Sequence, residues 1–289
     1  MKPTLRHDVP GLGRSIFYRT SFFTVFLFYD KLFQIFEEGM EAMKVYYSQE
    51  FAHSYSSDPA AAPGRMESVL AAIEGRVDFA DVVPASMEDI RACHTERHVQ
   101  RVKSMGIYDI AALAAGGAIQ AATTGLKEPA FALVRPPGHH ASADSAWGFC
   151  YFNNMAIALM RLRKEGLIRR AFILDFDLHY GDGTVNILGQ SDFVNILNPS
   201  DGDAGRYLLA VEKSMPDDAD IIGVSAGFDN HLEDWGGLLS TDDYRKLGRM
   251  TRNAAEKSGG GCFAVLEGGY NHQVLGQNVA AFLEGMEGK

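Results

Sequence analysis

Short apolar runs rich in β-branched residues alternate with amphipathic segments along most of the chain. From residue 44 onward there is no long linker, low-complexity tract or internal repeat. Several runs are apolar at every position, as in strands buried between two layers of helices. This alternation predicts βαβ units and a single doubly wound α/β domain with a parallel sheet. The predicted strands are 44–47, 80–83, 130–134, 171–174, 193–197, 221–225 and 262–266.

Segments with helical periodicity lie between these runs. Ser86, Thr95 and Thr241 precede three of them and are suitable N-cap residues. The Ala-rich segment 108–123 contains Gly116-Gly117, which would allow a helix to pack closely against the sheet. The predicted helices are 66–74, 87–93, one that begins after Thr95, 108–123, 155–165 and 242–257.

Residues 1–42 differ from the rest and are predicted to be an N-terminal extension to a domain at 43–289. Residues 21–29 are strongly apolar, but they are too few for a membrane span, which takes about 20 residues. Arg14 and Arg19 precede this run as in a signal peptide, yet no small-residue cleavage site follows. We interpret the extension as an accessory apolar, amphipathic helix or as a misassigned start, because Met43 directly precedes a predicted strand.

Composition narrows the class of partner. The 289 residues carry a formal net charge of -10, which argues against a nucleic-acid binder because phosphate contacts need a positive surface. The same charge would attract a cationic amine. Cys93, Cys150 and Cys262 lie far apart and form no C-x-x-C pair. A disulfide scaffold or a cysteine zinc site is therefore not expected, and the predicted location is a reducing cytoplasm.

Four of the predicted strands lead directly into clusters of polar residues. In an open parallel sheet, ligands bind outside the carboxyl ends of the strands, so side chains from these clusters are expected to meet. One such strand end would mean little, but four on one sheet edge predict a site. The clusters are 135–140, 175–183, 226–229 and 267–270.

The second cluster has the pattern of a metal site. Asp175, Asp177 and His179 alternate with apolar residues, and an extended backbone would place all three on one face. Carboxylates and an imidazole suit Zn²⁺ with an open position for water. Two ligands can come from this segment, and Asp229 is the natural third. Fe²⁺ remains an alternative, because iron sites use the same donor types in the reverse ratio.

Two further features suit acid–base chemistry beside a metal. His139 and His140 follow a rigid Pro-Pro-Gly turn, and a pair of adjacent histidines there is hard to explain as core packing. Asp175 and Asp182 are left as carboxylates that could fix the tautomer of each imidazole and raise its basicity. Tyr270 follows two glycines, and its phenol could donate to a developing oxyanion.

Five motifs, in order, resemble the histone deacetylase family, which includes acetylpolyamine amidohydrolases. The resemblance runs from about residue 44 to the C-terminus and is highly specific. It implies an arginase/deacetylase fold, with a parallel sheet of about eight strands flanked by helices. It also implies a zinc-dependent hydrolase that removes an acetyl or other acyl group from an amine, such as acetyl-lysine or an acetylated polyamine. The motifs are Arg-Pro-Pro-Gly-His-His (135–140), Gly-Phe-Cys-Tyr-Phe-Asn-Asn (148–154), Asp-Phe-Asp-Leu-His-Tyr-Gly-Asp-Gly-Thr (175–184), Ser-Ala-Gly-Phe-Asp-Asn-His (225–231) and Leu-Glu-Gly-Gly-Tyr (266–270).

The resemblance also assigns acid–base roles by position. His140, oriented by Asp182, would be the main general base and acid. His139, paired with Asp175, would assist electrostatically or in proton transfer. Tyr270 would polarise the acyl oxygen.

Ligand and substrate contacts follow from the same resemblance. Gly148 and Phe149 would line the channel for the aliphatic stem of the substrate. A potassium ion held by backbone carbonyls around 175–179 is a further expectation. The implied zinc ligands are Asp177, His179 and Asp229.

The chain departs from the family pattern mainly outside the catalytic motifs. Tyr180 replaces the second residue of the usual His-His-Gly. The segment 94–111 is short and has no counterpart of the loop aspartate that grips the substrate backbone in many members. The segment 198–220 lacks the glycine-rich loop that supplies a second aromatic channel wall, and 58–65 only loosely matches His-Pro-Glu-x-Pro-x-Arg. We therefore expect intact chemistry with reduced substrate recognition.

Two alternatives remain open at this point. One is a non-catalytic binder of acylated amines, and the other is a binuclear manganese ureohydrolase of the arginase type. The motifs supply three metal ligands and use the remaining Asp and His residues in pairs, which favours one metal. The short loops would leave an open site for bulky substrates or a channel completed by a neighbouring subunit in a homo-oligomer.

Overall fold

A single sheet of seven parallel strands lies at the centre of the protein, in the order β2-β1-β3-β7-β6-β4-β5. The computed structural model describes residues 42–289. The helix predicted in the N-terminal extension therefore lies outside the described residues. The sheet has seven strands where the resemblance implied about eight, and each of the seven corresponds to one predicted apolar run. The strands are β1 Lys44–Tyr46, β2 Asp78–Ala80, β3 Ala130–Ala132, β4 Ala171–Asp175, β5 Val194–Leu197, β6 Ile221–Ala226 and β7 Gly261–Leu266.

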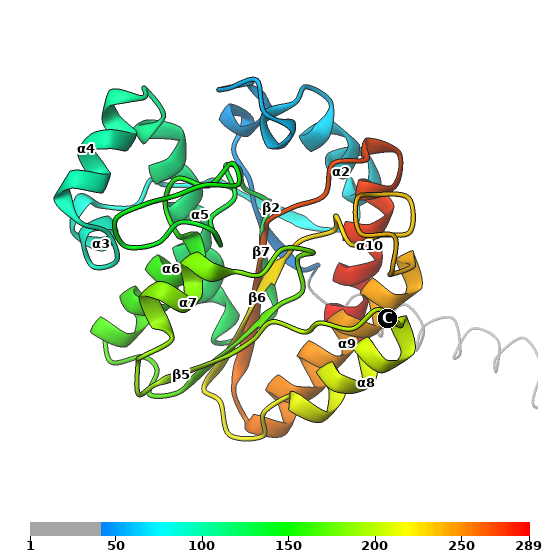
Figure 1. Cartoon of the computed structure of the whole chain (residues 1–289). Helices are drawn as coiled ribbons and strands as arrows, with labels where there is room; N and C mark the ends of the chain where they lie inside the picture. The colour runs from blue at the N-terminus through cyan, green and yellow to red at the C-terminus, as the bar shows by residue number, and fades with distance from the viewer. Residues whose placement is uncertain (1–41) are drawn as a thin grey trace, which may run out of the picture. The chain divides into compact units, whose positions relative to one another are not determined.

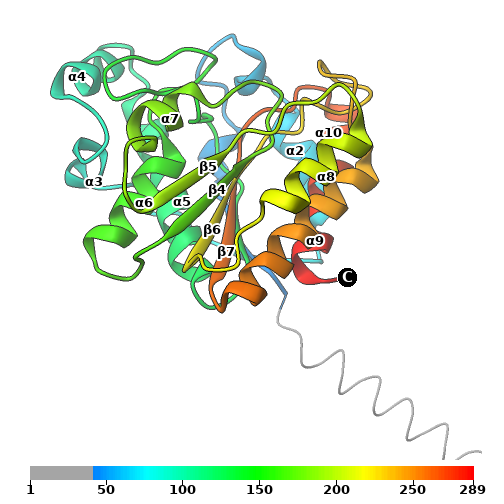
Figure 2. The same cartoon turned by 60° about the horizontal axis from the view of Figure 1, so that its bottom comes forward.

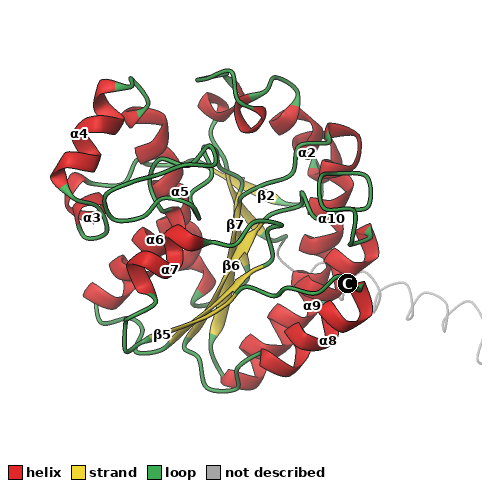
Figure 3. Ribbon diagram, in the orientation of Figure 1, coloured by secondary structure: helices red, strands yellow, loops and turns green. Residues whose placement is uncertain are grey.

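Helices cover both faces of this sheet (Figures 1 and 3). Figure 2 shows α5 and α6 on one side of the sheet, and α8 and α9 on the other. Every residue of β3, β4 and β6 is buried, which explains why these runs are apolar on both faces. Among the helices from residue 42 onward, none is both long enough and apolar enough to cross a membrane. The helices are α2 Arg65–Ile73, α3 Met87–Arg91, α4 Glu96–Ser104, α5 Tyr108–Gly125, α6 Asn154–Lys164, α7 Asp182–Leu188, α8 Ala204–Ser214, α9 Thr241–Ser258 and α10 His272–Glu287, with short 3-10 turns η1 Gln49–Ala52 and η2 Pro59–Ala61.

Several predicted boundaries are wrong: β1 and β3 end at Tyr46 and Ala132 rather than at 47 and 134, β2 covers Asp78–Ala80 rather than 80–83, and one helix cap is misplaced. Ser86 and Thr95 cap α3 and α4 as predicted, but the cap of α9 is Ser240 rather than Thr241. The Ser240 hydroxyl accepts from the Asp243 N–H while the Asp243 carboxylate accepts from the Ser240 N–H, a reciprocal capping box that Thr241 is too late to make. Strand β2 ends at Ala80 instead of continuing to residue 83, since the Val83 N–H donates to the Gln120 side chain instead of to a strand.

Gly116 and Gly117 allow α5 to pack closely against its neighbours, as predicted from the sequence. A Cβ on Gly116 would lie 1.8 Å from the carbonyl oxygen of Val83, and one on Gly117 would lie 2.7 Å from a Val134 methyl group. Both positions are buried. Only glycine therefore lets α5 approach the segments on either side of it this closely.

Candidate functional site

Asp177, His179 and Asp229 converge beyond the carboxyl ends of β4 and β6. One potential ligand atom from each lies within 4.8 Å of the other two. The Nδ1 atom of His179 lies 3.2 Å from Oδ1 of Asp177 and 3.1 Å from Oδ2 of Asp229. The structure thus brings together the three residues predicted to bind the metal.

The backbone that presents them differs from the expected extended strand. Strand β4 ends at Asp175, and residues 177–179 form a bend. The Leu178 N–H donates to Oδ1 of Asp229, and the His179 N–H donates to Oδ1 of Asp177. These bonds fold the segment toward β6, so period-two alternation is not what aligns the side chains.

The arrangement fits a divalent cation. Oδ2 of Asp229 is buried and accepts no hydrogen bond from any residue in 42–289, although His179 Nδ1 lies close by. A buried carboxylate oxygen without a partner is costly, and a metal ion would supply the missing partner. Burial and the neighbouring Asp177 charge raise the pKa of Asp229, as expected for two carboxylates that share a site without a cation.

Two glycines leave room for this cluster. A Cβ at Gly227 would lie 2.0 Å from Oδ2 of Asp177, and one at Gly268 would lie 2.7 Å from Oδ2 of Asp229. The Gly268 N–H also donates to Oδ2 of Asp177 at 2.9 Å. Both glycines belong to the motifs that follow β6 and β7, which explains why those motifs are glycine-rich.

The two adjacent histidines each have their own carboxylate. Nδ1 of His139 lies 3.1 Å from Asp175, and Nδ1 of His140 lies 2.7 Å from Asp182, the pairing that the family resemblance implied. A carboxylate at Nδ1 places the proton there and leaves Nε2 for chemistry. Gly148 lies against His140, where a Cβ would come within 2.3 Å of the imidazole, so only glycine fits at this position.

The two imidazoles have opposite pKa shifts. Burial and the neighbouring His139 lower the pKa of His140 to about 4. Burial acts in the same direction on His139, but the carboxylates of Asp177 and Asp175 outweigh it and raise the pKa of His139 well above its usual value. The two shifts have different causes, because the Asp177 and Asp175 carboxylates face His139 while His140 lies next to His139.

Tyr270 lies at the same edge, after β7. Its ring is stacked on Trp235 with centroids 4.1 Å apart, and Phe149 meets it edge-on at 5.9 Å. The Tyr270 N–H donates to Asp234 at 2.8 Å, and the Arg65 guanidinium lies over the ring. Burial raises the pKa of Tyr270, so the phenol stays protonated and can act as a hydrogen-bond donor.

Trp147 also belongs to the site, although it is not among the residues predicted from sequence. Its indole is stacked on His140 with centroids 3.7 Å apart, and its Nε1–H donates to Oδ2 of Asp182 at 2.9 Å. Trp147 therefore contacts both members of the His140–Asp182 pair. The only signal in the sequence was its position directly before Gly148 in a quoted motif.

Glu267 and Arg65 were also missed. Oε2 of Glu267 accepts from the N–H groups of Gly138 and His139, and burial raises the pKa of this carboxyl to about 7. Arg65 donates to the carbonyl oxygens of Glu267 and Gly269. The two side chains fasten the segments that carry the histidines and Tyr270. Glu267 is part of a quoted motif, and Arg65 ends the loosely matching segment 58–65.

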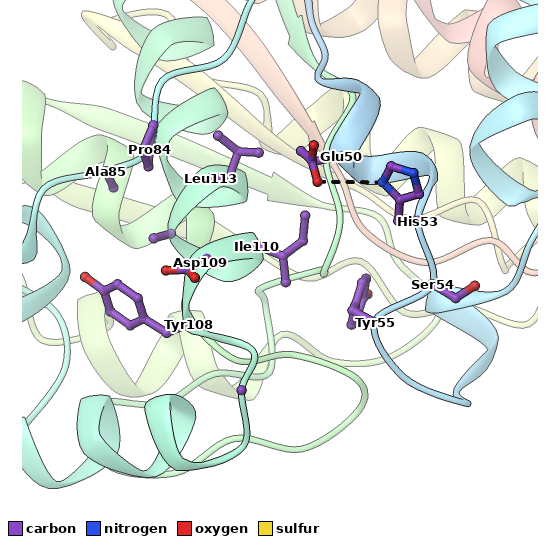
Figure 4. Close-up of a pocket in the computed structure, with 12 residues that line it drawn as sticks. Glu50, His53, Ser54, Tyr55, Pro84, Ala85, Tyr108, Asp109, Ile110 and Leu113 are labelled. Atoms are coloured by element: carbon purple, nitrogen blue, oxygen red, sulfur yellow. Dashed lines mark ion pairs between the residues drawn. The ribbon is translucent and has the colours of Figure 1, made fainter.

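A separate groove of about 650 Å³ lies between the η1 segment and the first turns of α5 (Figure 4). Its lining includes the ion pair of Glu50 and His53, 3.6 Å apart, together with Tyr55, Tyr108 and Asp109. Within residues 42–289, the ten predicted site residues are not part of this lining. The groove borders residues 105–107, the short connection between α4 and α5.

The chain is similar to known deacetylases. A sequence model described as the histone deacetylase domain matches residues 103–198 and 206–286. A probable deacetylase of Archaeoglobus fulgidus is 35% identical over 253 residues, covering 68% of this chain and 70% of the relative. A histone deacetylase-like amidohydrolase of Pseudomonas aeruginosa is 29% identical over 287 residues, covering 78% and 75%. The alignment with the archaeal protein has 253 positions, which is more than the 68% of this 289-residue chain that it covers. The archaeal protein therefore has segments that this chain lacks.

Two further comparisons concern the substrate class and the fold. A mouse protein named polyamine deacetylase HDAC10 is 30% identical over 225 residues, covering 63% of this chain and 34% of the relative. The crystal structure of the HDA15 HD domain superposes with a TM-score of 0.73 at 23% identity, covering 86% of this chain and 90% of that one. This likeness shows the fold. Because the family model matches most of the chain and the archaeal deacetylase is 35% identical, the chain belongs to the histone deacetylase family, a family of hydrolytic deacetylases.

Proposed function

We propose that this deacetylase is zinc-dependent and removes an acetyl or other acyl group from an amine such as acetyl-lysine or an acetylated polyamine. The observation that carries the proposal is the meeting of Asp177, His179 and Asp229 around an unpartnered carboxylate oxygen, beside two carboxylate-bound histidines. The names of the relatives, a probable deacetylase and a polyamine deacetylase, support the substrate class.

Asp177, His179 and Asp229 would hold the metal. Two carboxylates and one imidazole are donors that Zn²⁺ accepts, and Fe²⁺ remains the alternative. The chemistry that zinc supplies when bound is activation of water and polarisation of the acyl oxygen. The buried positions of both carboxylates keep competing water away from the ligand atoms.

His140 is the residue that would move protons. Asp182 holds the Nδ1–H, so Nε2 is the atom that takes a proton from the attacking water. The protonated imidazole then donates to the departing amine. His139, held by Asp175 at the bottom of the same cluster, assists by its charge. Tyr270 would donate its phenol hydrogen to the oxyanion that forms on the acyl group.

The two alternatives from the sequence fit less well. A binuclear ureohydrolase needs a second metal set, and the other metal-sized group in the described part of the chain is His139, Cys150 and Glu267. Asp175 already engages His139, and two backbone N–H groups already engage Glu267. A non-catalytic binder would have no use for His139, His140 and Tyr270 around one cluster.

Location and assembly remain predictions. Cys93, Cys150 and Cys262 are buried free thiols in the described part of the chain, which is compatible with the proposed cytoplasmic location. Acylated amines are the proposed partners, rather than nucleic acids. A homo-oligomer that completes the channel is also proposed, and sedimentation of the purified protein would test it.

A turnover screen tests the proposed function. Purified protein would be assayed against acetyl-lysine peptides, acetylated polyamines and longer acyl-lysines, and its metal content measured in parallel. We expect amine release from at least one class with about one zinc per chain. Saturable binding of these ligands without turnover would instead favour a binder, and two manganese ions per chain would favour a ureohydrolase.

A further inference from the structure

Trp235 is an exposed tryptophan at the mouth of the site. Its indole is stacked on the Tyr270 ring at 4.1 Å and 27°, and it meets the His179 imidazole edge-on at 6.0 Å and 88°. The side chain is nevertheless 53% exposed. Large apolar side chains that stay exposed beside a reaction centre often mark a binding surface. Trp235 is absent from the motifs that carried the family resemblance.

Hydrogen bonds on both sides of Trp235 hold it in place. Asp234 accepts from the N–H groups of Tyr270 and Asn271, each at 2.8 Å, and its other oxygen accepts from the Trp235 N–H. On the other side, the Gly236 N–H donates to the carbonyl oxygen of Asp229 at 2.8 Å. The indole is thus tied to the segment of the proposed oxyanion donor and to a proposed metal ligand.

Gly236 makes this turn sterically feasible. A Cβ at position 236 would lie 2.2 Å from the side-chain oxygen of Asn230 and 2.9 Å from a Leu178 methyl group. Only glycine lets the chain return this close to the metal cluster. The backbone of this loop therefore places position 235 beside Tyr270 and His179.

Phe149 contacts Tyr270 from a second direction. Its ring is edge-on to Tyr270 at 80°, whereas Trp235 is stacked on the same ring. Phe149 has a φ of 66°, in the left-handed region that a bulky residue adopts only where the surrounding structure imposes it. Phe149 and Trp235 thus contact the Tyr270 ring from two different directions.

Strand β5 ends at Leu197 and helix α8 begins at Ala204, so the connection between them is only residues 198–203. We propose that the exposed indole of Trp235, stacked on Tyr270 and next to His179, contacts the aliphatic stem of an acylated amine together with Phe149, which makes Trp235 a specificity-determining residue. The inference rests on the proposed deacetylase function.

Substrates with stems of different length test the proposal. Each methylene that the indole covers contributes about fourfold to binding, so Trp235→Ala should raise KM about 10-fold or more for an acetyl-lysine peptide. The kcat value should stay within about threefold, because no proton-transferring group is removed. Trp235→Phe should restore most of the loss, and an acetylated amine with a two-carbon stem should show a smaller effect. Metal content of both variants is measured as the control for folding.

Intrinsic fluorescence gives a readout that does not depend on turnover. The chain has two tryptophans, Trp147 and Trp235, so Trp147→Phe leaves Trp235 as the single indole. Titration of this variant with acetyl-lysine amide should change the emission in a saturable manner.

The outcomes separate the two proposals. If the wild-type protein hydrolyses no acylated amine, the proposed function fails. The role of Trp235 alone is overturned if the wild-type protein is active but the Trp235 emission does not respond to the ligand and the kinetics show no stem preference. The kinetics show none if Trp235→Ala keeps the wild-type KM, or if its KM rises equally for substrates of every stem length.

Discussion

At the floor of the site, which we define as His139, Asp175, Asp177, Asp229 and Glu267, the side chains are 0–6% exposed. At the rim, which we define as Trp147 and Trp235, they are 54% and 53% exposed. The floor is fastened by hydrogen bonds between strand ends, and its residues belong to the family motifs. The rim packs on the catalytic groups from loops, and neither tryptophan was given a role by sequence reasoning. Under the proposed function, reaction chemistry and substrate recognition would thus be built from different parts of the chain.

This difference has a physical cause. A buried charge needs a partner at a fixed place, so few substitutions at the floor are tolerated. An exposed aromatic side chain needs only a surface to stack on, and different loops can present one. We therefore expect substitutions at the floor to abolish the reaction and substitutions at the rim to alter its efficiency or its substrate range.

The largest effect is expected for Tyr270→Phe. Loss of an oxyanion donor lowers kcat by about 100- to 1,000-fold, whereas the ring that stacks on Trp235 is kept. KM and metal content should change little. Steady-state kinetics on an acetyl-lysine reporter, with metal analysis of the same preparation, measures this. Full activity in the variant would mean that Tyr270 is not the donor.

A smaller loss of kcat is expected when Trp147, which contacts both His140 and Asp182, is replaced. Trp147→Ala removes both the stack on His140 and the hydrogen bond to Asp182, and loss of a group that orients a catalytic side chain typically costs about 10- to 100-fold. Trp147→Phe keeps an aromatic ring but not the N–H, so it should lie between the alanine variant and the wild type in kcat. Equal kcat values for all three proteins would show that the indole merely covers the base.

The smallest effect concerns the stability of the loop that carries the rim. Nε2 of His94 accepts from the Asn153 N–H, so its proton is on Nδ1, which donates to the Ser142 carbonyl oxygen. Burial, aided by His98, lowers the pKa of His94 from 6.5 to about 4. A base with a lowered folded pKa contributes stability above pH 6.5 that is lost as pH falls toward 4.

Thermal and urea unfolding between pH 7.5 and pH 4.5 would measure this loss. The contribution of His94 is about 3 kcal/mol when complete. The stability advantage of wild type over His94→Gln should therefore shrink as pH falls through this window. An advantage that stays constant with pH would contradict the lowered pKa of His94 in the folded protein.

All of the floor except the role of Glu267 could be predicted from sequence, because its residues follow apolar runs. Strand ends in a parallel sheet must share an edge, so Asp177, Asp229 and Tyr270 had to come close once the strands were identified. The bend at 177–179 and the cap at Ser240 could not be predicted as reliably, since both depend on which of two neighbouring polar groups wins a local hydrogen bond.

The rim could not be predicted for a different reason. Trp147 and Trp235 act through contacts with residues distant in sequence, and nothing in their local pattern distinguishes them from core tryptophans. Their positions became evident only from the loops that hold them, such as the turn in which Asp234 binds the backbone of Tyr270.

The most direct test of the account is the metal content of wild-type protein beside Asp177→Asn and Asp229→Asn, which keep the side-chain volume. Elemental analysis of the purified proteins should find about one zinc per wild-type chain and much less in either variant. Zinc added back after chelation should restore activity to the wild type alone. Variants that keep the full metal content, or a metal-free wild type that remains fully active, would contradict the assignment of this cluster as the metal centre.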